Sequence, residues 1–397
     1  MATMSNQVRF FSSDMPDSPT LSGTAGSLIE VMDACLVNGF GSRSVNSVVV
    51  AGGVATVLIS AGHPFAEGDV IRLAGADPEA LNDDWRIAST TADSLVFSVA
   101  GLGIADGTAV GTMTVSRAPA GWEKLHAAAG KAAYRSLQYA THNGMICHVD
   151  DSGATTATWR GYESMSGIDV GTDPFPNEGQ QAVGLYLAKS NVASTSPRKW
   201  AVVADAKRIV LLLAFSQTYP NQTIPYVFGR AENSALDPWA CFINGFMTSS
   251  AALQVNVGIN GLPWTQETAA GTGKWAARDG SGVQKSVEVS HRYFSYSSNY
   301  VSGNALLAPA TLGDSLMPCS LLACTFGASP STHSPRFVVP AIRTLMQHVP
   351  DSLAIGLEKI GVSGNGFLFC RQSGGLTSSG LAKTCFLVSL GRDGKWD

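Results

Sequence analysis

The stretch SVVVAGGVATVLISAGHPFAEGDVIRLAG, Ser47–Gly75, decides the fold class of this chain. Two β-branched runs flank Gly52-Gly53, and a glycine pair at this place favours a hairpin, because glycine takes a positive φ without steric cost. Glu67–Asp69 then supplies a turn before the run VIRLAG. The stretch therefore predicts three successive strands joined by turns.

Short strands continue beyond this stretch to about residue 116. The runs WRIAST, SLVFSVA and AVGTMTVS are separated by turn residues at the close spacing of a small barrel or sandwich. We therefore expect residues 46–116 to form one small all-β module, inserted into a larger domain.

One helix is expected before the module. Ser27 and Glu30 have the spacing of a capping box, in which each side chain bonds a free amide of the first turn. Gly39 or Gly41 can end this helix after about three turns. Its expected buried face consists of Leu28, Val31, Met32 and Cys35. Residues 1–45 should thus be an extended arm and a helix that packs on the larger domain.

The larger domain, residues 117–397, repeats the strand pattern over longer runs. Examples are KWAVVAD, KRIVLLLAF and CFINGFM, which alternate with clusters of Gly, Pro, Asn, Asp and Ser. The segment PAIRTLMQHVP, between Pro340 and Pro350, is predicted to contain a helical turn or two. We expect a mainly β chain of β-sandwich or barrel-like domains with one short N-terminal helix, the large domain forming one unit or two subdomains.

Composition argues against several function classes. Only 14% of the 397 residues are charged, and the net charge of −4 comes without a basic cluster, so nucleic-acid binding is not expected. The apolar run Ile209–Phe215 is too short to cross a bilayer, and the first residues lack the pattern of a signal peptide. We expect that the chain does not insert into a membrane and that it is made in a cytoplasm. A weakly charged surface also favours coverage by other subunits, including copies of the same chain.

Cysteine usage indicates a reduced protein. The seven cysteines are odd in number, scattered and mostly set in apolar runs, as expected for small buried side chains. They are Cys35, Cys147, Cys241, Cys319, Cys324, Cys370 and Cys385. Cys319 and Cys324 lack a second pair at metal spacing. We expect no metal ion and no cofactor.

The segment CHVDD, Cys147–Asp151, gathers a thiol, an imidazole and two carboxylates. On a strand, Cys147 and Val149 would share one face, and His148 and Asp150 the other. A His-Asp face can bind a metal or move a proton. A strand that enters an Asp-Ser-Gly turn explains the same residues without a ligand, and we favour that interpretation.

The segment GTAGS, Gly23–Ser27, opens the expected helix, so its amides could hold an anion. It lacks the lysine of a phosphate-binding loop, and helix capping is sufficient to explain it. GVSGNG, Gly361–Gly366, does not have the spacing of a nucleophile elbow. None of the seven histidines shows a paired metal spacing. They are His63, His126, His142, His148, His291, His333 and His348.

Two sets of residues bear on glycan cleavage or binding. Carboxylates for glycoside cleavage are thinly spread; they are Asp173, Glu178, Glu232 and Asp237. Aromatic residues in turn-rich stretches could stack on sugars, although such residues are more often core or interface anchors; they are Trp239, Trp264, Trp275, Tyr293, Tyr296 and Tyr300. We assign no catalytic, cofactor-binding or metal-binding residue.

Ordered stretches of the first half resemble a known group of proteins. They are LSGTAGSLIEVMDACLVNGFG, VNSVVVAGGVATVLISAGHPFAEGDVIRLAGADPEALN, GIADGTA, APAGWEK, YRS, VDDSG, GYESM and DPFP. On these residues the chain resembles uncharacterised virion structural proteins of tailed phages and prophages of Gram-negative bacteria. Further positions also resemble a small β module of phage structural and tail-fibre proteins; they are Gly62-His63, Phe65, Gly68-Asp69, Gly75 and Leu81-Asn82.

The resemblance implies a non-enzymatic virion component, made in the bacterial cytoplasm and located in the particle. It implies that the chain belongs to the tail, as part of a fibre, of the baseplate or of a tube-associated assembly. The implied partners are other virion proteins. A tail protein that binds a host surface glycan, a capsid decoration protein and, less favoured, a polysaccharide-degrading enzyme are the alternatives. The residues do not distinguish head from tail.

Overall fold

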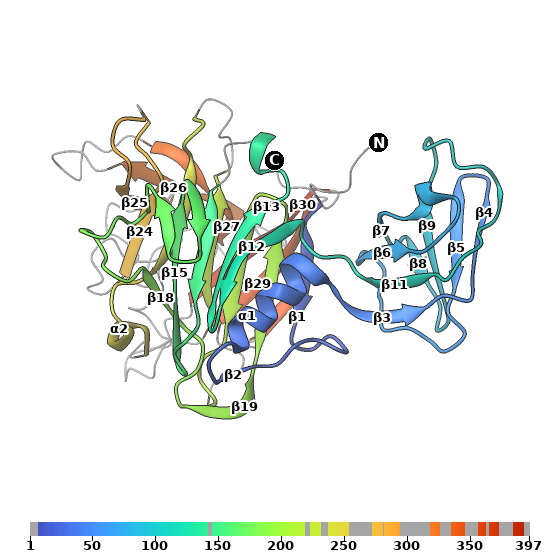
Figure 1. The fold of residues 1–397 in the computed structure, drawn as a ribbon, viewed down its shortest axis with the longest axis horizontal. Helices are drawn as coiled ribbons and strands as arrows, with labels where there is room; N and C mark the ends of the chain where they lie inside the picture. The colour runs from blue at the N-terminus through green and yellow to red at the C-terminus, as the bar shows by residue number, and fades with distance from the viewer. Residues whose placement is uncertain are drawn as a thin grey trace, which may run out of the picture.

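The computed structural model describes residues 7–141, 145–218, 223–231, 237–253, 272–280, 282–293, 318–325, 335–345, 356–362, 365–372 and 384–392. The chain is mainly β, which confirms the expected fold class. A small module lies to one side of a larger domain that holds the helix and a curled sheet (Figure 1).

The module consists of two sheets that enclose one apolar core. The sheet orders are β10-β4-β5-β9-β8 and β3-β11-β6-β7. The strands are β3 (Phe40–Ser44), β4 (Ser47–Ala51), β5 (Val54–Leu58), β6 (Val70–Ala74), β7 (Asp84–Arg86), β8 (Ser89–Thr90), β9 (Ser94–Ser98), β10 (Gly107–Thr108) and β11 (Thr114–Arg117), with a 3-10 turn, η3, at Glu79–Leu81. Trp85 and Phe97 stack at 4.8 Å in the core. Both sheets contribute side chains to this core, as in a β-sandwich.

The predicted hairpin is confirmed. Gly52 and Gly53 join β4 to β5 with φ values of 57° and 77°, in the region that favours glycine. The second sheet starts earlier than expected, because β3 lies before residue 46 and pairs with β11 through Ser44 and Thr114. The two sheets together therefore span residues 40–117.

Deleting residues 40–117 and joining Gly39 to Ala118 through a short Gly-Ser linker should leave a soluble remainder. The helix buries its apolar face against the large domain, and Arg9, which now contacts the module, would become exposed to water. Circular dichroism should show a β-rich spectrum and one cooperative melting transition. Aggregation of the remainder would mean that the large domain depends on the module for folding.

The predicted helix is present and its predicted cap is wrong. It consists of α1 (Ser27–Met32) and a π-helical turn, η2 (Asp33–Asn38), and ends at Gly39, whose φ is 72°. Its expected apolar face is fully buried. Gly26 takes the N-cap position, and the Ser27 hydroxyl donates instead to the Ser22 carbonyl oxygen at 2.8 Å. No capping box forms, because the helix starts one residue earlier and the Glu30 amide donates to the Gly26 carbonyl oxygen at 3.0 Å.

The large domain is a sheet that curls into layers. Within the described residues its main sheet has 17 strands. The first layer holds β12 (Trp122–Ala128), β13 (Lys131–Ser136), β14 (Ile146–Asp150), β15 (Thr156–Tyr162) and β18 (Leu185–Ala188). The middle layer holds β1 (Arg9–Ser12), β20 (Trp200–Ala204), β21 (Arg208–Leu213), β22 (Ile224–Arg230), β23 (Cys241–Phe246) and β24 (Thr272–Ala276). The first and middle layers meet where Tyr186 of β18 pairs with Phe246 of β23.

The remaining elements extend and border this sheet. They are β25 (Val287–Tyr293), β26 (Pro318–Thr325), β27 (Pro335–Leu345), β28 (Gly356–Val362), β29 (Asn365–Gln372) and β30 (Thr384–Arg392), the pairs β16 (Ser164–Gly167) with β17 (Val170–Thr172) and β2 (Leu21–Gly23) with β19 (Ser194–Arg198), a 3-10 turn, η4 (Tyr139–Thr141), and α2 (Ser249–Leu253). Residues Ala341–Leu345, where a helical turn was predicted, lie on β27, so that prediction is wrong. Ile342 pairs there with Val388 of β30, and ladder hydrogen bonds outweigh the local helical preference. Residues 346–350 lie outside the described residues.

The middle layer is buried on both faces. One face packs on the first layer through Trp159, Tyr226 and Phe228, and the other packs on β27 through Phe242 and Phe337. All residues of β20 and β21 are buried. A strand covered on both sides cannot alternate polar and apolar residues, which explains the runs WAVVA and RIVLLL.

Candidate functional site

The joint between the module and the large domain is the candidate functional site. The chain enters the module after Gly39 and returns through Arg117 to Ala118, and these two connections lie against each other. A Cβ on Gly39 would stand 2.2 Å from the Arg117 carbonyl oxygen, so only glycine fits. The Ala118 amide donates to the Val70 carbonyl oxygen at 3.0 Å. The close approach ties the entry and the exit of the module together.

Arg117 anchors the exit from the module. Its Nη1 lies 2.5 Å from Asp69 Oδ2, and its Nη2 donates to the Pro64 carbonyl oxygen at 2.7 Å. Its guanidinium also lies over the Phe65 ring, 5.3 Å from the centroid. Asp69 is itself positioned by the Ala66 amide at 3.0 Å. Residues 64–69, which include the predicted turn at Glu67–Asp69, thus surround the buried Arg117 side chain.

A second set of contacts joins β1 of the large domain to β7 of the module. Arg9 Nη2 lies 2.6 Å from Asp84 Oδ2, with side chains only 2% and 10% exposed. Arg72 binds the other Asp84 oxygen at 2.7 Å. Arg86 donates from Nε to the Gln7 side-chain oxygen at 3.0 Å and from Nη2 to the Val8 carbonyl oxygen at 3.3 Å. An ion pair with Arg9 and the hydrogen bonds from Arg86 therefore hold the module to β1 and to the two residues before it.

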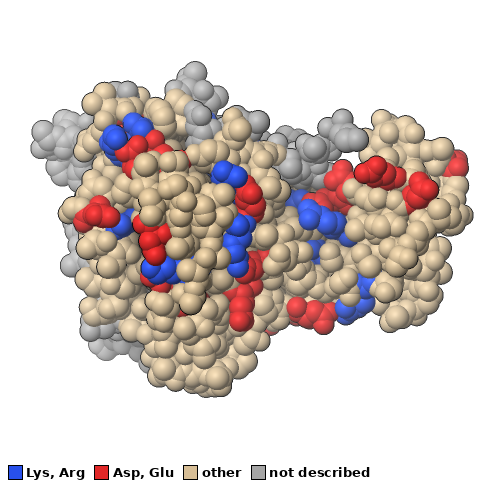
Figure 2. Space-filling view, viewed as in Figure 1, with Lys and Arg blue, Asp and Glu red and all other residues tan. Residues whose placement is uncertain are grey.

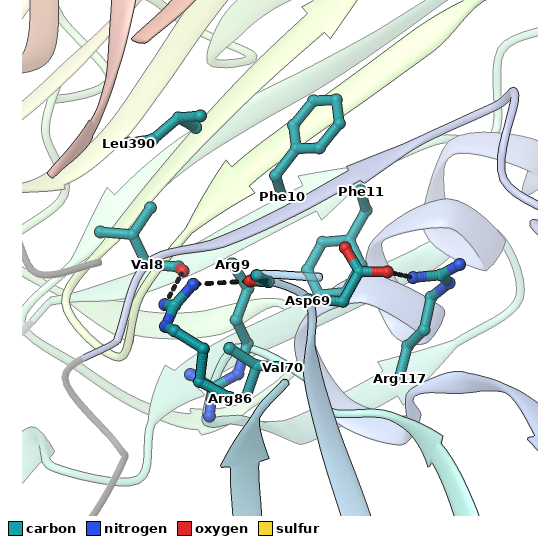
Figure 3. Close-up of a pocket in the computed structure, with 10 residues that line it drawn as sticks. Val8, Arg9, Phe10, Phe11, Asp69, Val70, Arg86, Arg117 and Leu390 are labelled. Atoms are coloured by element: carbon teal, nitrogen blue, oxygen red, sulfur yellow. Dashed lines mark hydrogen bonds and ion pairs between the residues drawn. The ribbon is translucent and has the colours of Figure 1, made fainter. Parts of the chain in front are cut away.

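A cavity of about 70 Å³ lies between these contacts, lined by Val8–Phe11, Gly68–Val70, Arg86, Arg117 and Leu390 (Figure 3). Burial lowers the pKa of Arg9 and of Arg86, and the charge of Arg9 lowers the pKa of Arg86 further. The lining consists of arginine side chains, one carboxylate and apolar groups. Such a lining suits a contact that fixes the module to the large domain. Figure 3 shows Asp69 facing Arg117 while Arg86 reaches the carbonyl oxygen of Val8, directly before β1.

The CHVDD and GTAGS segments meet at a second buried charge cluster. Asp151 Oδ2 accepts from the Leu28 amide at 2.8 Å and from the Ile29 amide at 3.3 Å. Lys189 binds Asp151 Oδ1 and donates to the Thr24 carbonyl oxygen at 2.6 Å; the side chains of both ionic partners are fully buried. Burial raises the pKa of Asp151 and lowers the pKa of Lys189. The anion held at the start of α1 is thus the chain's own carboxylate.

The rest of CHVDD follows the predicted strand alternation. Cys147 and Val149 are buried in the core, whereas His148 and Asp150 lie on the other face of β14. Asp150 Oδ1 accepts from the Ser152 amide at 3.0 Å, as in the predicted Asp-Ser-Gly turn. His148 packs edge-on against Tyr162, and its Nε2 is buried without a hydrogen-bond partner.

His148 should make stability depend on pH. Burial is the main cause that lowers the pKa of His148 below 6.5; Asp150 and Asp169 oppose this shift, whereas Lys131 and Arg160 add to it. The unfolded chain therefore binds a proton before the folded chain does, and stability present above about pH 6.5 is lost as the pH falls through the folded pKa. When the pH falls from 7.5 to 5.5, the melting temperature of the wild type should decrease by more than that of His148→Asn. Equal losses would contradict this role.

Several of the residues weighed for glycan chemistry are engaged in other contacts. Asp173 binds Lys285 at 2.5 Å, Asp237 binds Arg336 at 2.6 Å, and Glu178 is exposed. Trp275 is buried in the core, and Arg278 lies 4.4 Å from the centroid of the half-buried Trp239 ring. Glu232, Trp264, Tyr296 and Tyr300 lie outside the described residues, as does the side chain of Tyr293. Ion pairs thus occupy oxygens of Asp173 and Asp237.

The cysteine prediction is confirmed for Cys35, Cys147 and Cys241, which are buried and free, and whose thiol pKa values are raised by burial. Cys319 and Cys324 lie on β26, Cys370 on β29 and Cys385 on β30, with side chains outside the described set. His142, His333 and His348 also lie outside it. Among the described residues no group of three His, Cys, Asp or Glu could hold a metal ion. In the same part of the chain no helix is long and apolar enough to cross a membrane.

Comparisons with known proteins give little. No family model and no curated protein matches the chain. Among solved structures, it is similar to a chain described as Phage phi92 endosialidase, with 9% sequence identity and a TM-score of 0.16. The match covers 88% of this chain and 52% of that chain, so this chain spans about half of its length. A likeness at this TM-score carries no argument about function.

Proposed function

We propose that this chain is a structural component of a bacteriophage virion, located in the tail, and that it acts through contacts with other virion proteins. The resemblance of the first half to virion proteins of tailed phages is the basis for assigning the chain to a phage particle. The observation that carries the mode of action is the joint, where the Arg9–Asp84 ion pair and the hydrogen bonds from Arg86 to Gln7 and Val8 hold the module beside the large domain. An assembly protein needs such fixed geometry, because each subunit contact depends on the orientation of the part that makes it.

The buried charges support this role better than a catalytic one. Asp151 and Lys189 satisfy each other and the start of α1, and Asp84 is bound by two arginines. Catalytic sites instead leave a nucleophile or base facing a site for substrate. The charged groups of the Asp151–Lys189 pair and of the Asp84 cluster instead bind neighbouring elements of the fold.

Mass spectrometry of purified particles from a producing host tests the proposal. The chain should be present at a copy number that is constant between preparations. Its absence from the particle would exclude the proposal. Incubation of the purified chain with host envelope polysaccharide provides the second test, because release of fragments would favour an enzyme, and saturable binding without cleavage would favour a glycan-binding tail protein.

A further inference from the structure

The outer face of the five-stranded module sheet carries no charged side chain on its three long strands. Directly paired residues share a face, so Val49, Thr56 and Val96 form one row with Thr108 of β10. Val54 and Leu58 flank this row on β5, and the other outward residues of β4, β5 and β9 are serines and an alanine. We call this surface the distal face.

The distal face is open to solvent in the single chain. Val49 and Val54 are each 42% exposed and Leu58 is 37% exposed, whereas the alternate residues of the same strands form the module core. Contiguous exposed apolar side chains with no charge among them mark association sites on protein surfaces. The distal face is therefore a candidate association site.

The face is directed away from the rest of the molecule. The β3-β11-β6-β7 sheet contains Asp84 and Arg117 of the joint, so it lies towards the large domain. In Figure 1, β4 and β5 lie on the far side of the module. The joint thus presents the distal face outward, where a second protein can reach it.

The charges around the face indicate the chemistry of that partner. The module, residues 40–117, contains eight carboxylates and four basic residues, and all four basic residues lie on the β3-β11-β6-β7 sheet; they are Arg43, Arg72, Arg86 and Arg117. Exposed acidic residues in the loops include Asp77, Asp93 and Asp106. Figure 2 shows red groups over the module and blue groups gathered towards the large domain. The free surface of the module is therefore neutral at the distal face and acidic in loops at its ends, where Asp106 bonds the Gly52 amide of the β4–β5 turn and Asp93 directly precedes β9.

We infer that the distal face docks a different virion protein, one that presents an apolar patch bordered by lysine or arginine; this inference rests on the proposed function. A second copy of the face fits less well, because it would bring two acidic borders together, and like charges across an interface are unfavourable. The apolar centre supplies affinity, and the acidic border selects the partner and speeds its approach.

The test compares particles assembled with Val49→Glu/Leu58→Glu and with a matched control, Val170→Glu, which alters a 62% exposed valine on β17 of the large domain. Melting temperatures of the purified chains should match wild type, because all three side chains face solvent. Burying two unpaired carboxylates in an interface is costly, so the double variant should enter particles about tenfold less than the control or worse.

Zero-length coupling of carboxylates to amines in wild-type particles, read by mass spectrometry, identifies the partner. We expect links from Asp77, Asp93 or Asp106 to lysines of a different virion protein. Equal incorporation of the double variant and the control would overturn the inference, and so would links made only to a second copy of this chain. Absence of the wild-type chain from particles would instead refute the proposed function, which keeps the two failures distinguishable.

Discussion

Replacing Lys189 by methionine should lower the free energy of unfolding by about 3–5 kcal/mol at neutral pH, because it leaves a buried carboxylate without its cation. Asp151 would keep only the Leu28 and Ile29 amides as partners for its side chain. The methionine fills much of the lysine volume, so the loss reports charge rather than a cavity. Urea denaturation measures it.

The same variant should respond to pH in a diagnostic way. Burial already raises the pKa of Asp151 above 3.8 with Lys189 present, and removing the lysine raises it further. A group whose folded pKa is raised supports stability below its unfolded pKa and loses that support as the pH rises through the folded value. The deficit of Lys189→Met should therefore shrink as the pH falls towards about 4.

Two further variants complete the test. Asp151→Asn/Lys189→Met removes both charges, and it should recover much of the stability lost by Lys189→Met. Lys199→Met breaks the exposed pair with Asp14 and should cost under about 1 kcal/mol. If Lys189→Met were no worse than Lys199→Met, the buried pair would not be holding α1 in place.

Asp84→Asn should weaken the joint by about 3–5 kcal/mol, because Arg9 is buried and loses its counter-charge. Arg72, which is 43% exposed, can turn to solvent, so most of the cost falls on Arg9. Hydrogen exchange should rise first at β1 and β7, before the core strands β20 and β21 open.

The matched control is Asp17→Asn, which breaks the half-exposed pair with Arg43. An exposed pair of this kind contributes under about 1 kcal/mol. Similar exchange at β1 and β7 in the two variants would show that the Arg9–Asp84 contact does not hold the module.

Local features of the fold were predictable from the sequence because neighbouring residues determine them. The Gly52-Gly53 turn follows from φ values that only glycine takes easily, and the alternation of His148 with Val149 follows from strand geometry. The apolar run Ile209–Phe215 marks a strand buried on two faces, although the sequence does not tell which layers cover it.

The two charge clusters could not be predicted, because their partners are distant in the chain. Arg9 and Asp84 are 75 residues apart, and Lys189 and Asp151 are 38 apart. The carboxylate that bonds the first helix amides, Asp151, is likewise distant in the chain, at 123 residues from Leu28. A lysine directly after the apolar run LYLA was the available signal for Lys189, because a lysine among buried residues needs a carboxylate.

Cryo-electron microscopy of purified particles tests the central claim most directly. The map should contain this chain in the tail, with the module held beside the large domain by the Arg9–Asp84 and Arg86–Gln7 contacts and its distal face covered by another virion protein. A complete map of the particle in which no density fits this chain would contradict the account.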